Sequence, residues 1–174
     1  YKNVPRDMVV VDGYEGEIPV TFNCREIGYY HSLEYDFINR GPVVPHQKVT
    51  FSRNVTVKRI AIDSSPVTNA QYKEFLHATN YQPRFSENFL KHWINGEIPV
   101  GTEQEPVVYV DLDDARAYAK WVGKRLPREE EWQLAIKQAK GKKQEMHSNT
   151  WEMTESEYND GRNRFCILKG GSEY

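Results

Sequence analysis

Two short helices with their own start signals, set among strand and turn segments, constrain the fold of this chain most. The first is predicted to open at Thr68, where Gln71 three residues on completes a capping box for the free N–H groups. The second opens at Asp111 and ends at Gly123, a residue that takes the left-handed conformation easily. Strands and helices do not alternate, which argues against a parallel α/β sheet. The sequence predicts an α+β fold with two main helices packed on irregular antiparallel β structure.

Each helix carries an apolar stripe at helical spacing, which predicts the face that it buries. The buried positions expected are Tyr72, Phe75, Leu76 and Thr79 in the first helix and Ala115, Tyr118, Ala119 and Val122 in the second. A shorter third helix is predicted from Pro127, with Glu129, Glu130 and Glu131 near the positive end of its dipole and with Trp132 and Ala135 buried. Residues 137–143 are basic and lack an apolar period, which predicts a solvated loop.

Runs of β-branched and aromatic residues between turn residues predict strands in the rest of the chain. These runs are Met8–Val11, Ile18–Phe22, two segments between Val49 and Ile62, and a closing strand at Phe165–Leu168. Residues 29–45 are punctuated by Pro and Gly without a period, which predicts a loop. With 174 residues the chain is long enough for one domain with a sizeable core, so we expect a single domain over residues 1–174.

Composition excludes some classes of partner. The formal net charge is −2 with both signs interspersed, so the sequence offers no basic stripe for nucleic acid. No apolar run approaches the ~18 residues of a membrane span. The five histidines are scattered without metal-ligand spacing, and the two cysteines, Cys24 and Cys166, permit one disulfide but no cysteine metal knuckle. Asn54-Val55-Thr56 is an acceptor pattern for N-glycosylation.

Five short phrases follow one another in a fixed order. They are Pro66–Asn69, Pro106–Val110, Gly123–Pro127, Asn149–Glu152 and Lys169–Ser172. In this order they resemble the formylglycine-generating, sulfatase-modifying-factor family, and the resemblance covers about Met8 to Ser172. It implies a compact C-type-lectin-like fold. It also implies the chemistry of that family, in which a pair of cysteines that binds copper(I) takes part in oxidising a substrate cysteine.

The chain departs from that family in three places. Arg128 stands where a Thr is usual, so another group must satisfy an N–H at the start of the third helix. Between Trp132 and Asn149 only a short segment remains, where most relatives carry a long insertion with a calcium site. The cysteine pair of the family lies beyond the Gly-Gly-Ser motif, whereas Cys166 lies before it. We therefore expect the sequence to be C-terminally incomplete and expect no copper site in this chain. A buried free thiol and a Cys24–Cys166 disulfide both remain open for the two cysteines.

The resemblance also implies a second calcium site, in a phrase that spans Glu145–Glu152. Carried across residue by residue, Glu145 and Glu152 supply carboxylates, while Ser148 and Thr150 supply main-chain oxygens. Such an oxygen-rich shell suits a hard cation such as calcium. The alternative is that Glu145 is a solvated loop charge and that Asn149 and Trp151 stabilise the core.

A stretch dense in aromatic residues, 84–93, is the candidate ligand groove. Its candidate contact residues are Arg84, Asn88, His92 and Trp93, because aromatic rings beside polar side chains suit a sugar or a peptide. The alternative is that Phe89 and Trp93, spaced four apart, cover the core beside the first helix.

Three functions follow from these observations. The first is a divergent sulfatase-modifying-factor-like module that binds a protein or glycan ligand, or acts as an auxiliary domain, without the catalytic cysteine pair. The second is a formylglycine-generating oxidase whose cysteines lie beyond Tyr174. The third is a variable, ligand-displaying protein of C-type-lectin-like fold, with its contact surface near the C-terminus. The resemblance favours an extracytoplasmic or secreted setting.

Overall fold

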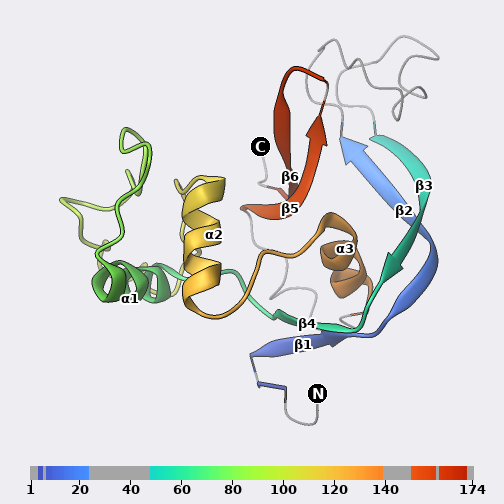
Figure 1. Cartoon of the computed structure of the whole chain (residues 1–174). Helices are drawn as coiled ribbons and strands as arrows, with labels where there is room; N and C mark the ends of the chain where they lie inside the picture. Colours follow the sequence, from blue (N-terminus) through green and yellow to red (C-terminus); the bar gives the residue numbers. More distant parts are fainter. Residues whose placement is uncertain (1–3, 6, 24–47, 139–149, 160, 172–174) are drawn as a thin grey trace.

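The structure is a computed structural model that describes residues 4–5, 7–23, 48–138, 150–159 and 161–171. In these ranges the chain forms three helices and three two-stranded antiparallel sheets (Figure 1). The sheets pair β1 (Met8–Val11) with β4 (Ile60–Asp63), β2 (Tyr14–Asn23) with β3 (Lys48–Val57), and β5 (Trp151–Asn159) with β6 (Arg164–Gly170). The helices are α1 (Asn69–Thr79), α2 (Leu112–Trp121) and α3 (Glu129–Gln138). The predicted α+β class is confirmed.

Two separate groups of buried side chains hold the fold together. One group joins the strands to α3 and contains Val11, Ile18, Val20, Val55, Val57, Trp132, Leu134, Ala135 and Ile136. The other lies around α1 and contains Tyr72, Phe75, Leu90 and Trp93, with partly buried residues such as Tyr118 of α2 against it. We call the first the β half and the second the helical half. In Figure 1, α1 and α2 lie on one side, and α3 lies inside the curve of the β2–β3 ribbon on the other.

The predicted caps of α1 and α2 are confirmed. Thr68 Oγ1 accepts from the N–H of Gln71, and the side chain of Gln71 accepts from the N–H of Thr68. Asp111 and Asp114 exchange the same pair of bonds at the start of α2. After α2 the chain turns at Gly123, whose φ of 71° is in the left-handed region. Each helix therefore begins with bonds made by residues of its own first turn.

The third helix differs from its prediction at both ends. It begins at Glu129, two residues after Pro127, and it includes Lys137 and Gln138, which the sequence assigned to a solvated loop. The helix continues because Ile136 still packs in the core of the β half. The N–H of Arg128 donates to Glu131 Oε2 at 2.7 Å, and the N–H of Glu129 donates to Ser156 Oγ at 3.0 Å. These two acceptors satisfy the first two N–H groups at the start of α3.

The strand predictions are confirmed, with one addition. All the predicted runs lie in β1 to β4 and β6, but β5, which begins at Trp151, was not predicted. The predicted loop at 29–45 lies outside the described residues. None of the three helices in the described part of the chain has the length and apolar character that crossing a bilayer requires.

Candidate functional site

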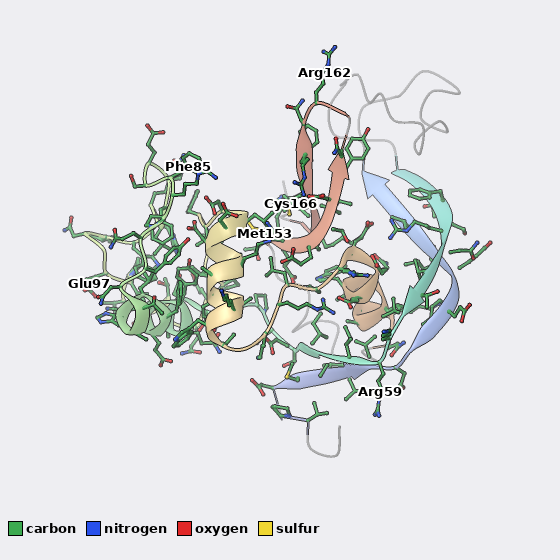
Figure 2. The ribbon with its side chains drawn as sticks, viewed as in Figure 1. Arg59, Phe85, Glu97, Met153, Arg162 and Cys166 are labelled. Atoms are coloured by element: carbon green, nitrogen blue, oxygen red, sulfur yellow. The ribbon has the colours of Figure 1, made fainter. Side chains whose placement is uncertain are left out.

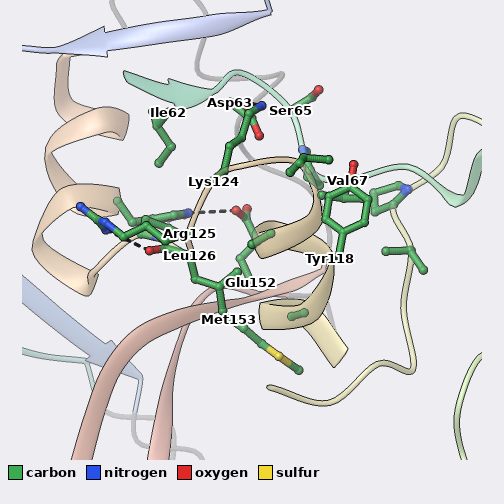
Figure 3. A pocket seen from close by; sticks show the side chains of 18 of the residues that line it. Ile62, Asp63, Ser65, Val67, Tyr118, Lys124, Arg125, Leu126, Glu152 and Met153 are labelled. Atoms are coloured by element: carbon green, nitrogen blue, oxygen red, sulfur yellow. Dashed lines mark hydrogen bonds and ion pairs between the residues drawn. The ribbon is translucent and has the colours of Figure 1, made fainter. Parts of the chain in front are cut away.

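A cleft of ≈ 800 Å³ lies between the two halves (Figure 3). Its walls come from Met8, residues 60–67, Tyr72, residues 106–110, three residues of α2, Val122 directly after α2, residues 124–127, Glu131, Trp132 and residues 150–153. The three residues of α2 are Ala115, Tyr118 and Ala119, which together with Val122 are the stripe that the sequence predicts to be buried. Only Ala119 among them is fully buried, while the other three are half-buried. The apolar face of α2 is therefore only partly covered, and it lines the cleft.

The cleft exists because the chain passes between the two halves at two places. It leaves β4 at Asp63 to start α1, and it leaves α2 at Trp121 to start α3. An ion pair of 2.6 Å between Lys124 Nζ and Asp63 Oδ1 ties these two crossing segments together. Figure 3 shows both residues beside Ile62 and Ser65 in the lining.

The charged residues of the cleft already have partners within the chain. The guanidinium of Arg125 donates to both carboxylate oxygens of Glu131 at 2.7 Å. Burial alone would raise the pKa of Glu131, but Arg125 and the N–H of Arg128 outweigh it and hold that pKa below its ordinary value of 4.5. Glu152 Oε2 accepts from Trp132 Nε1 at 3.0 Å. Because Arg125, Glu131 and Glu152 each have a partner within the chain, the surface left for a ligand is mainly apolar.

In the predicted ligand groove, Trp93 is buried, whereas Arg84 and Asn88 are exposed. Trp93 is 8% exposed and packs in the core of the helical half, as the alternative interpretation has it. The half-buried Phe89 packs against the same core. Arg84 and Asn88 are exposed: the guanidinium of Arg84 lies over the ring of Phe85, and Asn88 accepts from Lys91. Figure 2 shows Phe85 in a loop of the helical half.

The side chain of Asn69 fixes the orientation of His92. Asn69 is buried, its Nδ2 donates to the carbonyl of Thr102, and its Oδ1 accepts from Trp93 Nε1 at 3.0 Å. The same Oδ1 lies 3.0 Å from His92 Nε2, so Nε2 must carry a proton. Burial lowers the pKa of His92, although Glu105 opposes the shift. His92 is therefore neutral at pH 7, with its Nδ1 as the unprotonated nitrogen.

Tyr109 connects this stretch to the cleft. It lines the cleft, its ring lies 5.6 Å from that of His92, and Lys91 Nζ lies 4.4 Å from its centroid. Its φ of 57° and the φ of 49° at Leu90 are both left-handed, which costs energy for residues with a Cβ. The N–H of Leu90 donates to the carbonyl of Tyr109 at 2.9 Å and holds the two together. Of the groove candidates, His92 is the one that the structure brings next to the cleft.

Two of the four predicted calcium ligands lie within the described residues. Glu145 and Ser148 lie outside the described residues. Thr150 and Glu152 lie at the start of the β5–β6 hairpin, opposite Gly170, whose φ is 78°. A Cβ added at Gly170 would lie 2.9 Å from the carbonyl oxygen of Thr150 and 3.7 Å from Glu152 Oε1. The carbonyl oxygen of Thr150 and Glu152 Oε1 therefore both lie near Gly170, and the calcium site stays a prediction. In the described residues, no three His, Cys, Asp or Glu side chains form a metal-binding group.

The sulfur chemistry of the described residues is limited to one free thiol. Cys166 lies in β6, and its Sγ donates to the carbonyl of Thr154 at 3.3 Å. Cys24 lies outside the described residues. Figure 2 places Cys166 and Met153 on the β5–β6 hairpin. Met153 lines the cleft, whereas Cys166 does not.

Sequence reasoning missed the cleft as a whole. Its residues come from segments far apart in the chain, so no local motif marks it. One signal was present: the apolar stripe of α2 continues to Val122, and the Gly123–Pro127 phrase follows it directly. Both contribute to the lining.

Comparison with known proteins identifies the family that the sequence motifs resemble. Residues 7–145 match the Sulfatase-modifying factor enzyme 1-like domain. The inactive C-alpha-formylglycine-generating enzyme 2 of Mus musculus is 34% identical over 120 residues, which cover 49% of this chain and 39% of that protein. The formylglycine-generating enzyme of Streptomyces coelicolor is 30% identical over 131 residues, which cover 56% and 42%. The serine/threonine-protein kinase Pkn1 of Chlamydia trachomatis is 34% identical over 91 residues, which cover 47% and 15%.

The chain therefore matches well under half the length of these relatives. The alignment with the mouse protein runs over 120 positions yet takes in only 49% of this chain, so the relative carries residues that this chain lacks. The match to the domain extends over most of the chain, from Asp7 to Glu145, and the fold is the predicted α+β fold of C-type-lectin-like kind. The chain belongs to the family of the Sulfatase-modifying factor enzyme 1-like domain.

Proposed function

We propose that this divergent member of the family is a binding or auxiliary module that takes a protein ligand in the cleft between its two halves. The half-covered apolar stripe of α2 is the observation that carries the proposal, because an apolar helix face that lines a cleft favours a ligand that covers it. The partners already made by Asp63, Glu131 and Glu152 favour apolar peptide side chains over a sugar, which needs polar groups that are free to bind.

Two facts support a role without cysteine oxidation. The free thiol of Cys166 donates a hydrogen bond to the carbonyl of Thr154 within the β5–β6 hairpin. One of the relatives is named an inactive C-alpha-formylglycine-generating enzyme. The relatives named formylglycine-generating enzyme keep the oxidase as the alternative, with its cysteines beyond Tyr174. The sequence of the parent gene past that residue, and aldehyde formation on a cysteine peptide by the full-length protein, decide between the two.

The binding experiment presents the 174-residue chain to a displayed peptide library and to a glycan array. Selected ligands are then titrated by tryptophan fluorescence, since Trp132 and Trp151 both line the cleft. Met153→Gln places a polar group in the cleft wall and should weaken a peptide about tenfold, the effect of about 1.4 kcal/mol. Phe165→Gln is the matched control, because Phe165 is 50% exposed on the same hairpin outside the lining.

A second candidate function is supported by the hairpin itself. Trp151, Phe165 and Leu168 are all more than 40% exposed near the C-terminal end of the sequence, which is where the ligand-displaying alternative places its contact surface. The same two variants separate the candidates. Loss of binding in Phe165→Gln with retention in Met153→Gln assigns the ligand to the hairpin, and absence of any ligand in either screen rejects both.

Calcium remains a proposal for the hairpin start, with Glu145, Ser148, Thr150 and Glu152 as ligands. The ion would stabilise the folded state because it binds that state selectively. We expect a chelator to lower the melting temperature by several degrees and Glu145→Gln to abolish that shift. An identical melting temperature with and without the chelator removes the site.

A further inference from the structure

The two halves have separate cores and are connected by short segments of the chain. α1 packs on α2, whereas α3 packs on β1, β3, β5 and β6. Each half keeps its own buried core. The chain connects them only through the crossing segments at residues 64–68 and 122–128, within the part of the chain that the structure describes. Two packed bodies joined by two short segments around a cleft is the arrangement in which proteins close on ligands.

Among the residues that the structure describes, one ion pair joins α2 to β5 and so spans the two halves. Arg116, in the middle of α2, donates from Nε to both carboxylate oxygens of Glu155 at 3.1 Å and from Nη2 to Oε2 at 2.7 Å. Glu155 lies in β5, and its own N–H donates to the carbonyl of Pro127 in the second crossing segment. The pair therefore ties the helical half to the β half next to the segment about which they would turn. Such a forked geometry fixes orientation as well as distance.

The Arg116–Glu155 ion pair is partly exposed to solvent. The side chain of Arg116 is 41% exposed and that of Glu155 is 29% exposed, so water and salt compete with the contact. Other ion pairs of comparable length, such as Arg164–Glu157, join residues within one half and do not restrict relative movement. The contact between the halves therefore has a defined geometry but is accessible to water and salt.

We propose that the Arg116–Glu155 pair is a latch that controls the opening of the cleft. This inference rests on the proposed function in that the cleft is the site whose access the latch sets. Breaking the latch shifts the ratio of closed to open forms by up to about fivefold, the range expected for an exposed pair. A ligand that enters through the open form then associates faster by a similar factor.

The test measures the separation of the halves without any ligand. Ala78→Cys in α1 and Thr56→Cys in β3, both at exposed positions, carry the spin labels on a background with Cys24→Ser and Cys166→Ala. Distance distributions from pulsed electron spin resonance are compared for the wild-type latch and for Glu155→Gln, which keeps the shape of the side chain and removes its charge.

Two further variants control for general loosening. Glu157→Gln removes the ion pair with Arg164 in the same hairpin and should leave the distances unchanged. The double variant Arg116→Glu with Glu155→Arg restores an ion pair of reversed polarity and should return the distribution toward wild type. We expect Glu155→Gln to broaden the distribution toward longer distances, and about 1 M salt to do the same to the wild-type chain.

The outcomes separate this inference from the proposed function. If Glu155→Gln gives the wild-type distribution, or if Glu157→Gln widens it equally, the latch is rejected, whatever the chain binds. If the distribution widens as expected while both ligand screens are blank, the latch stands and the binding role of the cleft falls. If a ligand binds in the cleft and its association rate is the same in Glu155→Gln and wild type, the control of access is rejected.

Discussion

α2 begins with a cap made only by residues three positions apart, whereas the cap of α3 also needs a residue 27 positions further along the chain. The first cap is the exchange between Asp111 and Asp114. The second combines Glu131 with Ser156 of β5. The helical half can therefore form its helices from local sequence, while the β half needs β5 in place before α3 is complete. This difference separates what a motif can predict from what only the folded chain supplies.

The same contrast appears in the buried charges. Asp114, in the helical half, is buried beside residues of its own helix start and accepts from the hydroxyl of Tyr81. Glu129, in the β half, is equally buried, but its ion-pair partners come from other elements, with Arg53 Nη1 of β3 at 3.5 Å and Lys169 Nζ of β6 at 3.6 Å. Long-range ion pairs thus hold α3 to the strands on both sides.

Removing one large core side chain from each half should give the largest effect and show whether the halves unfold together. Trp132→Ala in the β half and Phe75→Ala in the helical half should each cost about 3–5 kcal/mol. Hydrogen exchange read in both halves tests the division. We expect protection to fall most in the half that carries the substitution, and equal loss in both halves would show a single cooperative core.

Breaking the buried ion pair of α3 should be the next largest effect. Glu129→Gln leaves the ammonium of Lys169, whose side chain is 11% exposed, without its carboxylate partner, at a cost of about 3 kcal/mol. Glu130→Gln removes a pair with Arg53 that is more exposed, so it should cost less than about 1 kcal/mol. Urea denaturation of both variants measures the difference, and equal costs would contradict the role of Glu129.

Removing one cap from each half should cost about 1 kcal/mol in both cases but act at different places. Thr68→Ala should expose the first turn of α1 alone. Ser156→Ala should loosen both α3 and the hairpin, because the bond to the N–H of Glu129 joins them. Amide exchange rates at the two helix starts test this. An effect of Ser156→Ala confined to β5 would contradict the claim that Ser156 stabilises the start of α3.

Acid should lower the free energy of unfolding through the two halves in different pH ranges. These changes should be the smallest of the effects predicted here. His92 has a pKa below its ordinary value of 6.5, so its contribution to stability is lost as pH falls from about 6.5 through its pKa in the folded state. Glu155 has a pKa held below 4.5 by Arg116, so its contribution is lost only below about pH 4.5. In a plot of the free energy of unfolding against pH, His92→Gln should flatten the higher of the two pH ranges. His77→Gln, at an exposed position, should leave that range unchanged.

The sequence was sufficient where the determinants are local. The box at Thr68 and Gln71, the turn at Gly123 and the apolar runs of the strands each predict an element that the structure contains. It was insufficient where partners are distant. The strand β5 was missed because its first residues read as part of a calcium motif. The start of α3 was placed too early because Pro127 is a good first helical residue, whereas the acceptor for the N–H of Glu129 is Ser156.

For the candidate site, local sequence patterns predicted single residues but not how these residues come together in space. The aromatic stretch at 84–93 was recognised, yet burial of Trp93 and the bond from His92 to Asn69 follow from packing against α1. The stripe of α2 was recognised as apolar, but that it lines a cleft depends on where β4 and β5 lie.

The most direct test of the account is covalent footprinting of the chain with and without a selected peptide ligand. A ligand in the cleft should protect residues of its walls, such as Ile62, Tyr118 and Met153, and leave Phe165 and Leu168 as reactive as before. Protection of Phe165 and Leu168 with unchanged labelling of the cleft walls would contradict the account and assign binding to the outer surface of the hairpin.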